Sequence, residues 1–224
     1  MLWVGSELSG IQQLSMRSFL YHGHSVTLFV YDPIKAPDGV EIMDGSLIMP
    51  REAIFQSHET FSAFSDVFRY QLLAVSNYLW ADADTICLRP DWNFDEYVFS
   101  YGEPYKLTNS VLSYPQESLL AKTLQEEAIF QEGKAYDELG PVLLTKVVAE
   151  LGLGGYALPQ DTFNPIDWSD YSWVYTPEIT EAVLKKCSNS HAVALYNYLL
   201  KYHKFDRDNF PEGSALDYWN KTFR

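Results

Sequence analysis

The sequence has few of the residues that mark several common classes of protein. Its 224 residues include only two cysteines, Cys87 and Cys187, which are too few for a framework of disulfide bonds. No apolar run approaches the roughly 18 residues that a membrane-spanning helix needs, so no transmembrane segment is expected. The chain does not open with a basic stretch followed by an apolar one, the pattern of a secretion signal. We therefore expect a cytoplasmic protein.

Basic residues are also scarce. Lysine and arginine together number 16, against 30 aspartates and glutamates, which gives a formal net charge of −14. This charge opposes general binding to nucleic acid or to anionic membranes, because both are polyanions. It does not exclude a small phosphorylated ligand, since a metal ion and one or two arginines can reverse the sign locally.

The signatures of several enzyme and metal-binding families are missing. The first predicted strand is followed neither by a glycine-rich dinucleotide loop nor by a lysine-containing phosphate loop. The absence of a Gly-x-Ser-x-Gly motif counts against an α/β-hydrolase. No histidine has the spacing to a partner that a structural zinc site needs. The histidines are His22, His24, His58, His191 and His203.

What the chain does have is the composition of a globular protein. Hydrophobic residues make up 47% and aromatic residues 16% of the sequence, enough to bury a core. No internal repeat, low-complexity tract or linker divides it. We therefore expect one domain over residues 1–224.

The first part of the chain predicts an α/β fold. Residues 2–5 form a short apolar strand, and Ser9 can cap a helix that runs to about Tyr21. Residues 25–31 form a second strand rich in β-formers. Strand, helix and strand within about thirty residues favour a parallel sheet.

The remaining pattern predicts further helices and strands. Helical spacing of phenylalanines and leucines predicts a helix over 57–76, and an apolar run predicts a strand over 79–87. We also predict loops over 33–56 with a short strand at 45–49, helices over 117–131 and 141–150, loops over 152–170, and a strand or a helix over 193–200. Residues 91–115 mix aromatic and turn-forming residues, and their pattern does not resolve.

Two carboxylates, Asp82 and Asp84, stand one residue apart at the end of an apolar segment. Alternate side chains of a strand point to opposite faces, but they can converge where the strand gives way to a turn. Mg²⁺ and Mn²⁺ prefer such oxygen ligands, with phosphate oxygens completing the coordination shell. The pair therefore favours a metal-dependent site for a phosphorylated ligand, although Asp-x-Asp also occurs in ordinary turns.

Asp66 and Arg69 lie three residues apart on the predicted helix, roughly opposite its phenylalanine stripe. One interpretation is a solvated ion pair worth only ~0.3–0.5 kcal/mol. The helix leads directly into the strand that carries Asp82 and Asp84, however, so its polar face could border the same cleft. Both interpretations stay open at this point.

A different family also uses two aspartates at the end of a strand. In aspartyl phosphatases the motif reads Asp-x-Asp-x-Thr/Val and usually closes the first strand of the domain. Here Ile86 takes the fifth position, and about eighty residues precede the motif. A phosphatase-type hydrolase is therefore an alternative.

Five motifs occur in an order that resembles the DXD-motif glycosyltransferases of family 32, in particular short bacterial members linked to surface polysaccharide synthesis. They lie at residues 2–5, 64–70, 82–90, 140–145 and 163–166. The resemblance implies a GT-A fold, a Rossmann-like and mostly parallel sheet flanked by helices. It also implies a retaining transfer, assisted by Mn²⁺ or Mg²⁺. The transferred group would be a hexose or N-acetylhexosamine from a nucleotide-sugar donor, with UDP the expected nucleotide. The acceptor would be a hydroxyl of a glycan or lipid-linked glycan.

The resemblance also implies roles for individual residues. Asp84 would bind the metal ion that clamps the diphosphate, and Asp82 would contact the ribose and the metal's water shell. Asp66 and Arg69 would bind the hydroxyls of the donor sugar. Trp3 would lie near the base. Asp66, Arg69, Asp82 and Asp84 are thus the candidate catalytic residues.

Two departures from the family pattern bear on activity. The usual Gly-Gly pair before the Asp-x-Asp is replaced by Asn77 and Tyr78, and the late histidine near the metal is replaced by Ala194. On a strand His191 would face the other way, because its offset from Ala194 is odd. The loss of a potential metal ligand leaves a second hypothesis, a non-catalytic protein that binds a nucleotide-sugar or glycan.

Overall fold

The computed structural model describes residues 1–129 and 138–224. Its first strands, β1 (Leu2–Trp3), β2 (Val26–Val30) and β3 (Val40–Asp44), form a sheet in that order. Both pairings, β1 with β2 and β2 with β3, are parallel. The parallel sheet that the first part of the sequence predicts is therefore confirmed for these strands.

Helix α1 (Gly10–Tyr21) connects β1 to β2. Ser9 is its N-cap, and the Ser9 N–H donates to Gln12 Oε1 over 3.2 Å. After the helix ends, Gly23 has a φ of +83°, the left-handed conformation that glycine adopts without strain. Both predicted ends of this helix are confirmed.

The predicted strand over 79–87 is two short strands in different sheets. β4 (Trp80–Ala81) pairs with β7 (Lys106–Ser113), and β5 (Thr85–Cys87) pairs with β8 (Ala192–Ala194). Residues 82–84 form a turn between them, closed by a hydrogen bond from Thr85 N to Asp82 O of 3.0 Å. The two candidate aspartates therefore stand where the chain passes from one sheet to another.

Residues 91–115, whose sequence pattern gives no clear prediction, contain a β-hairpin. β6 (Val98–Glu103) and β7 (Lys106–Ser113) are antiparallel, and β7 is the middle strand of the order β4-β7-β6. β5 and β8 (Ala192–Ala194) form a third, antiparallel sheet. The expectation of a mostly parallel sheet is thus correct only for β1–β3, because all the pairings in the other two sheets are antiparallel.

Two predictions, the helix over 57–76 and the strand over 45–49, differ from the structure. Helix α2 (Ser62–Ala74) begins five residues later than predicted, because residues 57–60 form a turn with mutual Ser57 and Thr60 hydrogen bonds. The strand predicted over 45–49 is wrong. Gly45–Leu47 is a 3₁₀ turn in which Asp44 Oδ1 accepts a hydrogen bond from Ser46 N over 2.8 Å.

The second half of the chain is mainly helical. α3 (Leu119–Glu127) falls within its predicted range, of which residues 130 and 131 lie outside the described residues, and α4 (Pro141–Glu150) has its predicted bounds. Residues 152–170 form loops and 3₁₀ turns, as expected. The segment 193–200 holds parts of both a strand and a helix, β8 and α6 (Asn197–Tyr202). The last helices are α5 (Thr180–Cys187) and α7 (Ala215–Thr222).

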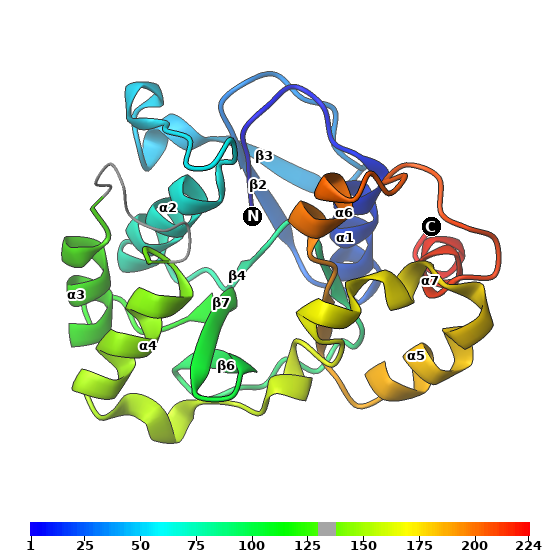
Figure 1. The fold of residues 1–224 in the computed structure, drawn as a ribbon. Helices are drawn as coiled ribbons and strands as arrows, with labels where there is room; N and C mark the ends of the chain where they lie inside the picture. Colours follow the sequence, from blue (N-terminus) through cyan, green and yellow to red (C-terminus); the bar gives the residue numbers. More distant parts are fainter. Residues whose placement is uncertain (130–137) are drawn as a thin grey trace.

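The helices lie on two sides of the central strands (Figure 1). α2, α3 and α4 gather on one side, where they share a buried core with β2, β4, β6 and β7. α1, α5 and α7 gather on the other side and share a core with β5 and β8. The turn that carries Asp82 and Asp84 runs between these two halves. Within the described part of the chain, every helix is too short or too polar to span a lipid bilayer.

The N-cap of α3 offers a test of the fold. Ser118 Oγ accepts a hydrogen bond from Ala121 N over 3.1 Å. We expect Ser118→Ala to lower the free energy of unfolding by about 1 kcal/mol, because an N-terminal N–H loses its partner. Chemical denaturation measures this. Ser6→Ala is the control, since Ser6 is exposed and lies outside any helix, and an equal loss in both variants would contradict the assignment of the cap.

Candidate functional site

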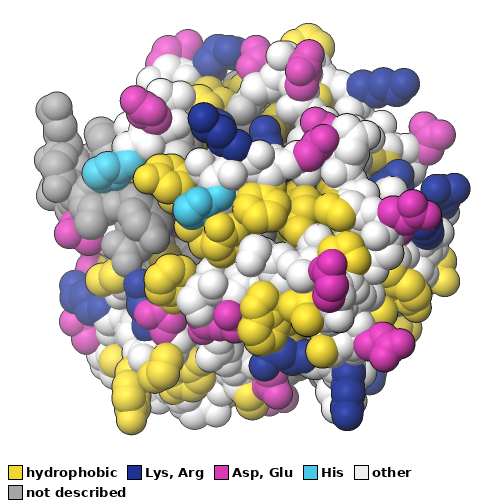
Figure 2. Space-filling view, turned by 45° about the vertical axis from the view of Figure 1, so that its right-hand side comes forward, with side chains coloured by type: hydrophobic (Ala, Val, Ile, Leu, Met, Phe, Trp, Pro, Cys, Tyr) yellow, Lys and Arg dark blue, Asp and Glu magenta, His cyan; other side chains and the backbone are white. Residues whose placement is uncertain are grey.

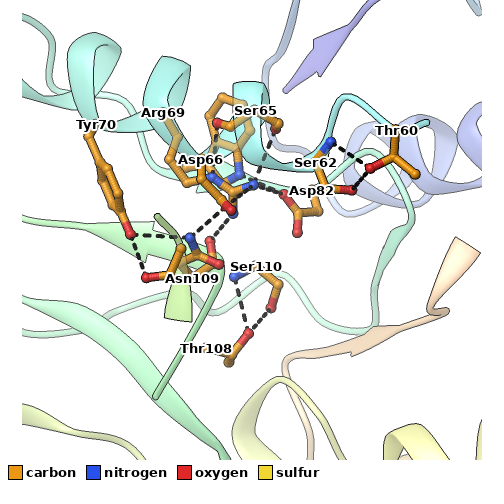
Figure 3. Close-up of polar contacts among 12 residues, drawn as sticks. Thr60, Ser62, Ser65, Asp66, Arg69, Tyr70, Asp82, Thr108, Asn109 and Ser110 are labelled. Atoms are coloured by element: carbon orange, nitrogen blue, oxygen red, sulfur yellow. Dashed lines mark hydrogen bonds and ion pairs between the residues drawn. The ribbon is translucent and has the colours of Figure 1, made fainter. Parts of the chain in front are cut away.

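The centre of the site is Arg69, which joins two of the other predicted residues (Figure 3). Its Nη2 lies 3.1 Å from Asp66 Oδ1 and 3.0 Å from Asp82 Oδ1. Arg69 is only 3% exposed and Asp66 only 6%. The interpretation of Asp66 and Arg69 as a solvated pair is therefore wrong, because the helix buries this face against β4 and β7. The structure brings the helix pair and the first of the two aspartates together.

Burial acts against the charge of Arg69, and its neighbours restore it. Desolvation by itself lowers the pKa of the guanidinium, but the charges of Asp82 and Asp66 outweigh this and raise the pKa overall. Trp80 contacts both members of this ion pair. Arg69 Cζ lies 4.8 Å from the centre of the Trp80 ring, and Trp80 Nε1 donates to Asp82 Oδ1 over 2.8 Å. A buried cation with two anionic partners and an aromatic face is held in one position.

A second group of polar residues supports the first. Asn109 Nδ2 donates to Asp66 Oδ1 over 2.8 Å, and Asn109 O accepts a 2.5 Å hydrogen bond from Arg69 Nη1. Tyr70 OH lies 3.2 Å from Asn109 Nδ2 and donates to Gly140 O over 3.1 Å. Residues of α2, of β7 and at the start of α4 thus hold the same carboxylate.

These supporting residues are not among the site residues that the sequence predicts. Tyr70 and Gly140 fall inside the quoted motifs, next to Arg69 and Pro141, so adjacency is the signal that could have found them. Asn109 sits in a segment whose pattern did not resolve, and its place became visible only through the pairing of β7.

Asp84 is held by a different part of the chain. Its Oδ2 accepts a hydrogen bond from Asn197 N over 2.8 Å, and its backbone oxygen accepts one from Leu195 N over 3.0 Å. Burial raises the pKa of the Asp84 carboxyl to about 6, and the negative charge of Asp82 acts in the same direction. Asp82 keeps 29% of its side chain exposed. Two carboxylates that repel each other at a partly open turn form a place where a cation would be stabilised.

The segment after β8 has an unusual backbone that places Asn197. Ala194 pairs with Thr85, one residue beyond Asp84. Tyr196 has a φ of +52°, and its hydroxyl donates to Ile166 O over 2.9 Å. Left-handed backbone is costly for a bulky residue, so this geometry persists because its surroundings hold it.

Arg207 also reaches this place from the C-terminal part of the chain. Its Nη1 donates to Asn197 Oδ1 over 3.2 Å. Its backbone is docked on the start of α1, where Ile11 N donates to Arg207 O over 3.0 Å. A Cβ at Gly10 would lie 2.9 Å from that same oxygen, so the close approach requires a glycine there. Arg207 is not among the site residues that the sequence predicts, because its contacts join parts of the chain that local patterns do not relate.

Two other residues of the sequence analysis lie elsewhere. His191 packs against Phe94, with ring centres 4.7 Å apart, and its Nε2 lies 3.2 Å from Asp91 O. It therefore stands at the opposite end of the β5–β8 ladder from Ala194 and does not replace the missing histidine. Trp3 is half-buried on β1, where its Nε1 donates to Glu7 O over 2.9 Å. Its place near a base stays a prediction.

The donor groups of the site suit a shared cation. Within residues 1–129 and 138–224, no three His, Cys, Asp or Glu side chains are grouped so that they could hold a metal ion. Asp82 and Asp84 contribute two hard oxygen donors, and Mg²⁺ is commonly bound through one or two carboxylates together with phosphate oxygens and water. The two carboxylates are donors of the kind that such an ion takes, and metal binding at this turn stays a prediction.

Comparisons with known proteins point to one class of enzyme. Residues 114–212 match a family model described as "Alpha 1,4-glycosyltransferase conserved region". This segment holds Asn197 and Arg207 but not the two aspartates. A solved structure titled "PaToxG Glycosyltransferase" is similar over 69% of this chain and 68% of that chain, with 14% identity and a TM-score of 0.50. No curated protein matches.

The family match supports glycosyl transfer in general. The structural likeness concerns the fold, which is one that a glycosyltransferase uses.

Gly140 provides a test of the buried network. A Cβ at this position would lie 2.4 Å from Asp66 Oδ2. We expect Gly140→Ala to displace the Asp66 carboxylate and to lower stability by about 1–3 kcal/mol, as overpacking does. Chemical denaturation measures this. Gly154→Ala is the matched control, because a Cβ there would meet no atom within 4 Å. Similar effects of the two substitutions would contradict the close contact.

Proposed function

We propose that this protein is a retaining glycosyltransferase with a metal-assisted nucleotide-sugar site. It would move a hexose or N-acetylhexosamine from a UDP-sugar to a hydroxyl of a glycan. One observation carries the proposal: Arg69 links the Asp66 helix to the Asp82–Asp84 turn in a single partly open site. The two glycosyltransferase comparisons support glycosyl transfer in general.

Asp84 and Asp82 would hold Mn²⁺ or Mg²⁺, and the bound ion would stabilise the negative charge that develops on the departing diphosphate. The chain's own part is to fix the two carboxylates. Asn197 N binds Asp84 Oδ2, while Arg69 and Trp80 hold Asp82 through its Oδ1. These contacts do not use Asp82 Oδ2, which therefore suits a ligand on the open side.

Arg207 would be the cation on the other side of the diphosphate. Asn197 links Arg207 to Asp84: its side-chain oxygen accepts from the Arg207 guanidinium, and its backbone N–H donates to Asp84. A phosphate group held beside Asp84 would then also meet Arg207, which Asn197 links to that aspartate. The planar guanidinium matches two phosphate oxygens at once.

Asp66 and Arg69 have a narrower role in this proposal than the family resemblance implies. Both side chains are almost fully buried, and Arg69 Nη2 contacts Asp66 and Asp82 at once. Arg69 therefore acts as a positioning residue that orients Asp82. The charge of Asp66 would help to stabilise an oxocarbenium-like sugar, as carboxylates do in glycoside hydrolysis. We assign no nucleophile.

The first experiment tests turnover. Purified protein with Mn²⁺ is incubated with a panel of UDP- and GDP-sugars, and nucleotide release is recorded. We expect release with one donor or a few donors, and a drop of at least about 100-fold in Asp84→Asn, because removing one electrostatic contact to the developing charge typically has this effect. Asp95→Asn is the control, since Asp95 is an exposed aspartate ten residues or so along the chain.

If no donor gives nucleotide release, and wild type and Asp84→Asn show the same background, the proposal that the protein is an enzyme is refuted.

The second experiment tests Arg207 by binding. Isothermal titration with UDP and Mn²⁺ should show an affinity about ten-fold lower in Arg207→Gln, because a charge-assisted contact to phosphate is worth roughly 1.5–3 kcal/mol. Binding of uridine, which lacks phosphates, should not change. Arg89→Gln is the control, because Arg89 pairs with Asp91 beyond the far end of β5. Equal losses for UDP and uridine would argue against a diphosphate contact.

Ala194 favours a second candidate function, a protein that binds a nucleotide-sugar without transferring the sugar. Ala194 lies opposite Thr85, the residue after Asp84, and takes the position at which the family resemblance implies a histidine. This candidate predicts thermal stabilisation by UDP-sugar and Mn²⁺ through mass action, with no product. Nucleotide release above the Asp84→Asn background would exclude it.

A further inference from the structure

Aromatic side chains lie on α6, which begins at Asn197 of the candidate site, and on the 3₁₀ segment Trp168–Tyr175. We call the group of rings in mutual contact the aromatic patch; it consists of Tyr171, Tyr198, Tyr202 and His203. Tyr198 is 51% and Tyr202 68% exposed, whereas Tyr171 is half-buried. Figure 2 shows hydrophobic side chains gathered across the middle of one face of the molecule. Large aromatic rings left in water at one place indicate a binding surface.

The rings of the patch form near-parallel pairs. Tyr198 and Tyr202 have ring centres 6.3 Å apart and planes inclined by 26°. Tyr171 and His203 stack at 5.3 Å with an inclination of 20°. Tyr202 and His203 join the two pairs, with ring centres 5.0 Å apart. The four rings are thus connected one to the next, with the planes of Tyr202 and His203 inclined by 84° between the two pairs.

The patch is continuous with the candidate site. Helix α6 starts at Asn197, whose N–H binds Asp84, and Tyr198 is the next residue. With a rise of about 1.5 Å per residue, the backbone of Tyr202 lies about 8 Å along the helix from Asn197. A sugar chain whose end reaches the aspartates could therefore lie over these rings.

The chemistry of the patch suits a sugar chain. The aliphatic residues of α6 turn inward, since Leu200 is buried and Leu199 half-buried, so the exposed groups are rings with polar edges. Tyrosine and tryptophan combine an apolar face with a hydrogen-bonding group. A pyranose ring has the same division, with apolar C–H faces and hydroxyls around the edge. Lys201 and Lys204 are exposed beside the rings, and residues 196–205 contain no carboxylate.

We propose that the aromatic patch binds the acceptor glycan, with sugar rings lying on Tyr198 and Tyr202. This inference rests on the proposed glycosyltransferase function. The patch orients the acceptor so that its terminal hydroxyl faces the donor at Asp84, and it takes no part in binding the nucleotide.

Direct binding of oligosaccharides tests the patch. Maltohexaose, cellohexaose and chitohexaose are titrated into the protein saturated with UDP and Mn²⁺, and tyrosine and tryptophan fluorescence is recorded. We expect at least one hexasaccharide to bind and its affinity to fall about ten-fold or more in Tyr198→Ala and Tyr202→Ala. Tyr202→Phe should keep most of the affinity, because it retains the ring. Tyr218→Ala is the matched control, since Tyr218 is 52% exposed on α7.

The outcomes separate the patch from the proposed function. UDP affinity and nucleotide release without acceptor should be the same in wild type and in both tyrosine variants, while the KM for an accepted oligosaccharide rises. If wild type binds UDP but none of the hexasaccharides, or if Tyr218→Ala weakens binding as much, the patch is not a glycan site and the transferase stands. If neither UDP binding nor release occurs, the proposed function itself fails.

A lipid surface is the other outcome to examine. Vesicles of phosphatidylcholine and phosphatidylglycerol are sedimented with wild type and with Tyr202→Ala. We expect no sedimentation of the protein, in keeping with its net charge of −14. Sedimentation that depends on Tyr202, without an effect on hexasaccharide binding, would overturn the glycan assignment in favour of a membrane contact.

Discussion

The buried charge of Arg69 is the constraint on which the candidate site depends. A guanidinium that is 3% exposed must be compensated, and Asp66, Asp82, the Asn109 carbonyl and the Trp80 ring do this together. Removing one partner of such a group typically costs about 3–5 kcal/mol, because it leaves a charge buried without compensation. The loss of any one partner would therefore destabilise the fold. Asp82 is the partner of Arg69 that remains partly exposed. The contact between Arg69 and Asp82 thus both positions Asp82 in the site and stabilises the core.

The other half of the site is assembled from late parts of the chain. Asp84 depends on the backbone of Asn197, which follows the left-handed Tyr196, and Arg207 reaches Asn197 from a turn docked on α1. One aspartate of the turn is thus held by α2 and β4, and the other by the segment after β8. Because the two halves of the molecule meet at residues 82–84, a ligand bound there would contact both.

Several parts of this arrangement could be predicted from the sequence and several could not. The capped helix after β1 and the bounds of α4 follow from local signals, namely Ser9 with Gln12 and proline at the start of α4. The strand over 79–87 was predicted as continuous, since its apolar pattern does not show that β4 and β5 have different partners. The solvated interpretation of Asp66 and Arg69 failed for the same reason: burial is set by β4 and β7, which helical spacing does not describe.

By itself, the sequence determined the classes of protein to exclude, the parallel βαβ start, and the pairs Asp66–Arg69 and Asp82–Asp84 as candidates for one site. These follow from composition, from periodicity and from motif order, all of which are local or additive along the chain. Only the tertiary structure decided that Arg69 joins the two pairs and that Asn109, Asn197 and Arg207 belong with them. It also decided that rings on α6, the helix that begins at Asn197, are exposed. Those relations join residues that are far apart in the chain, so they depend on how the sheets pair and pack.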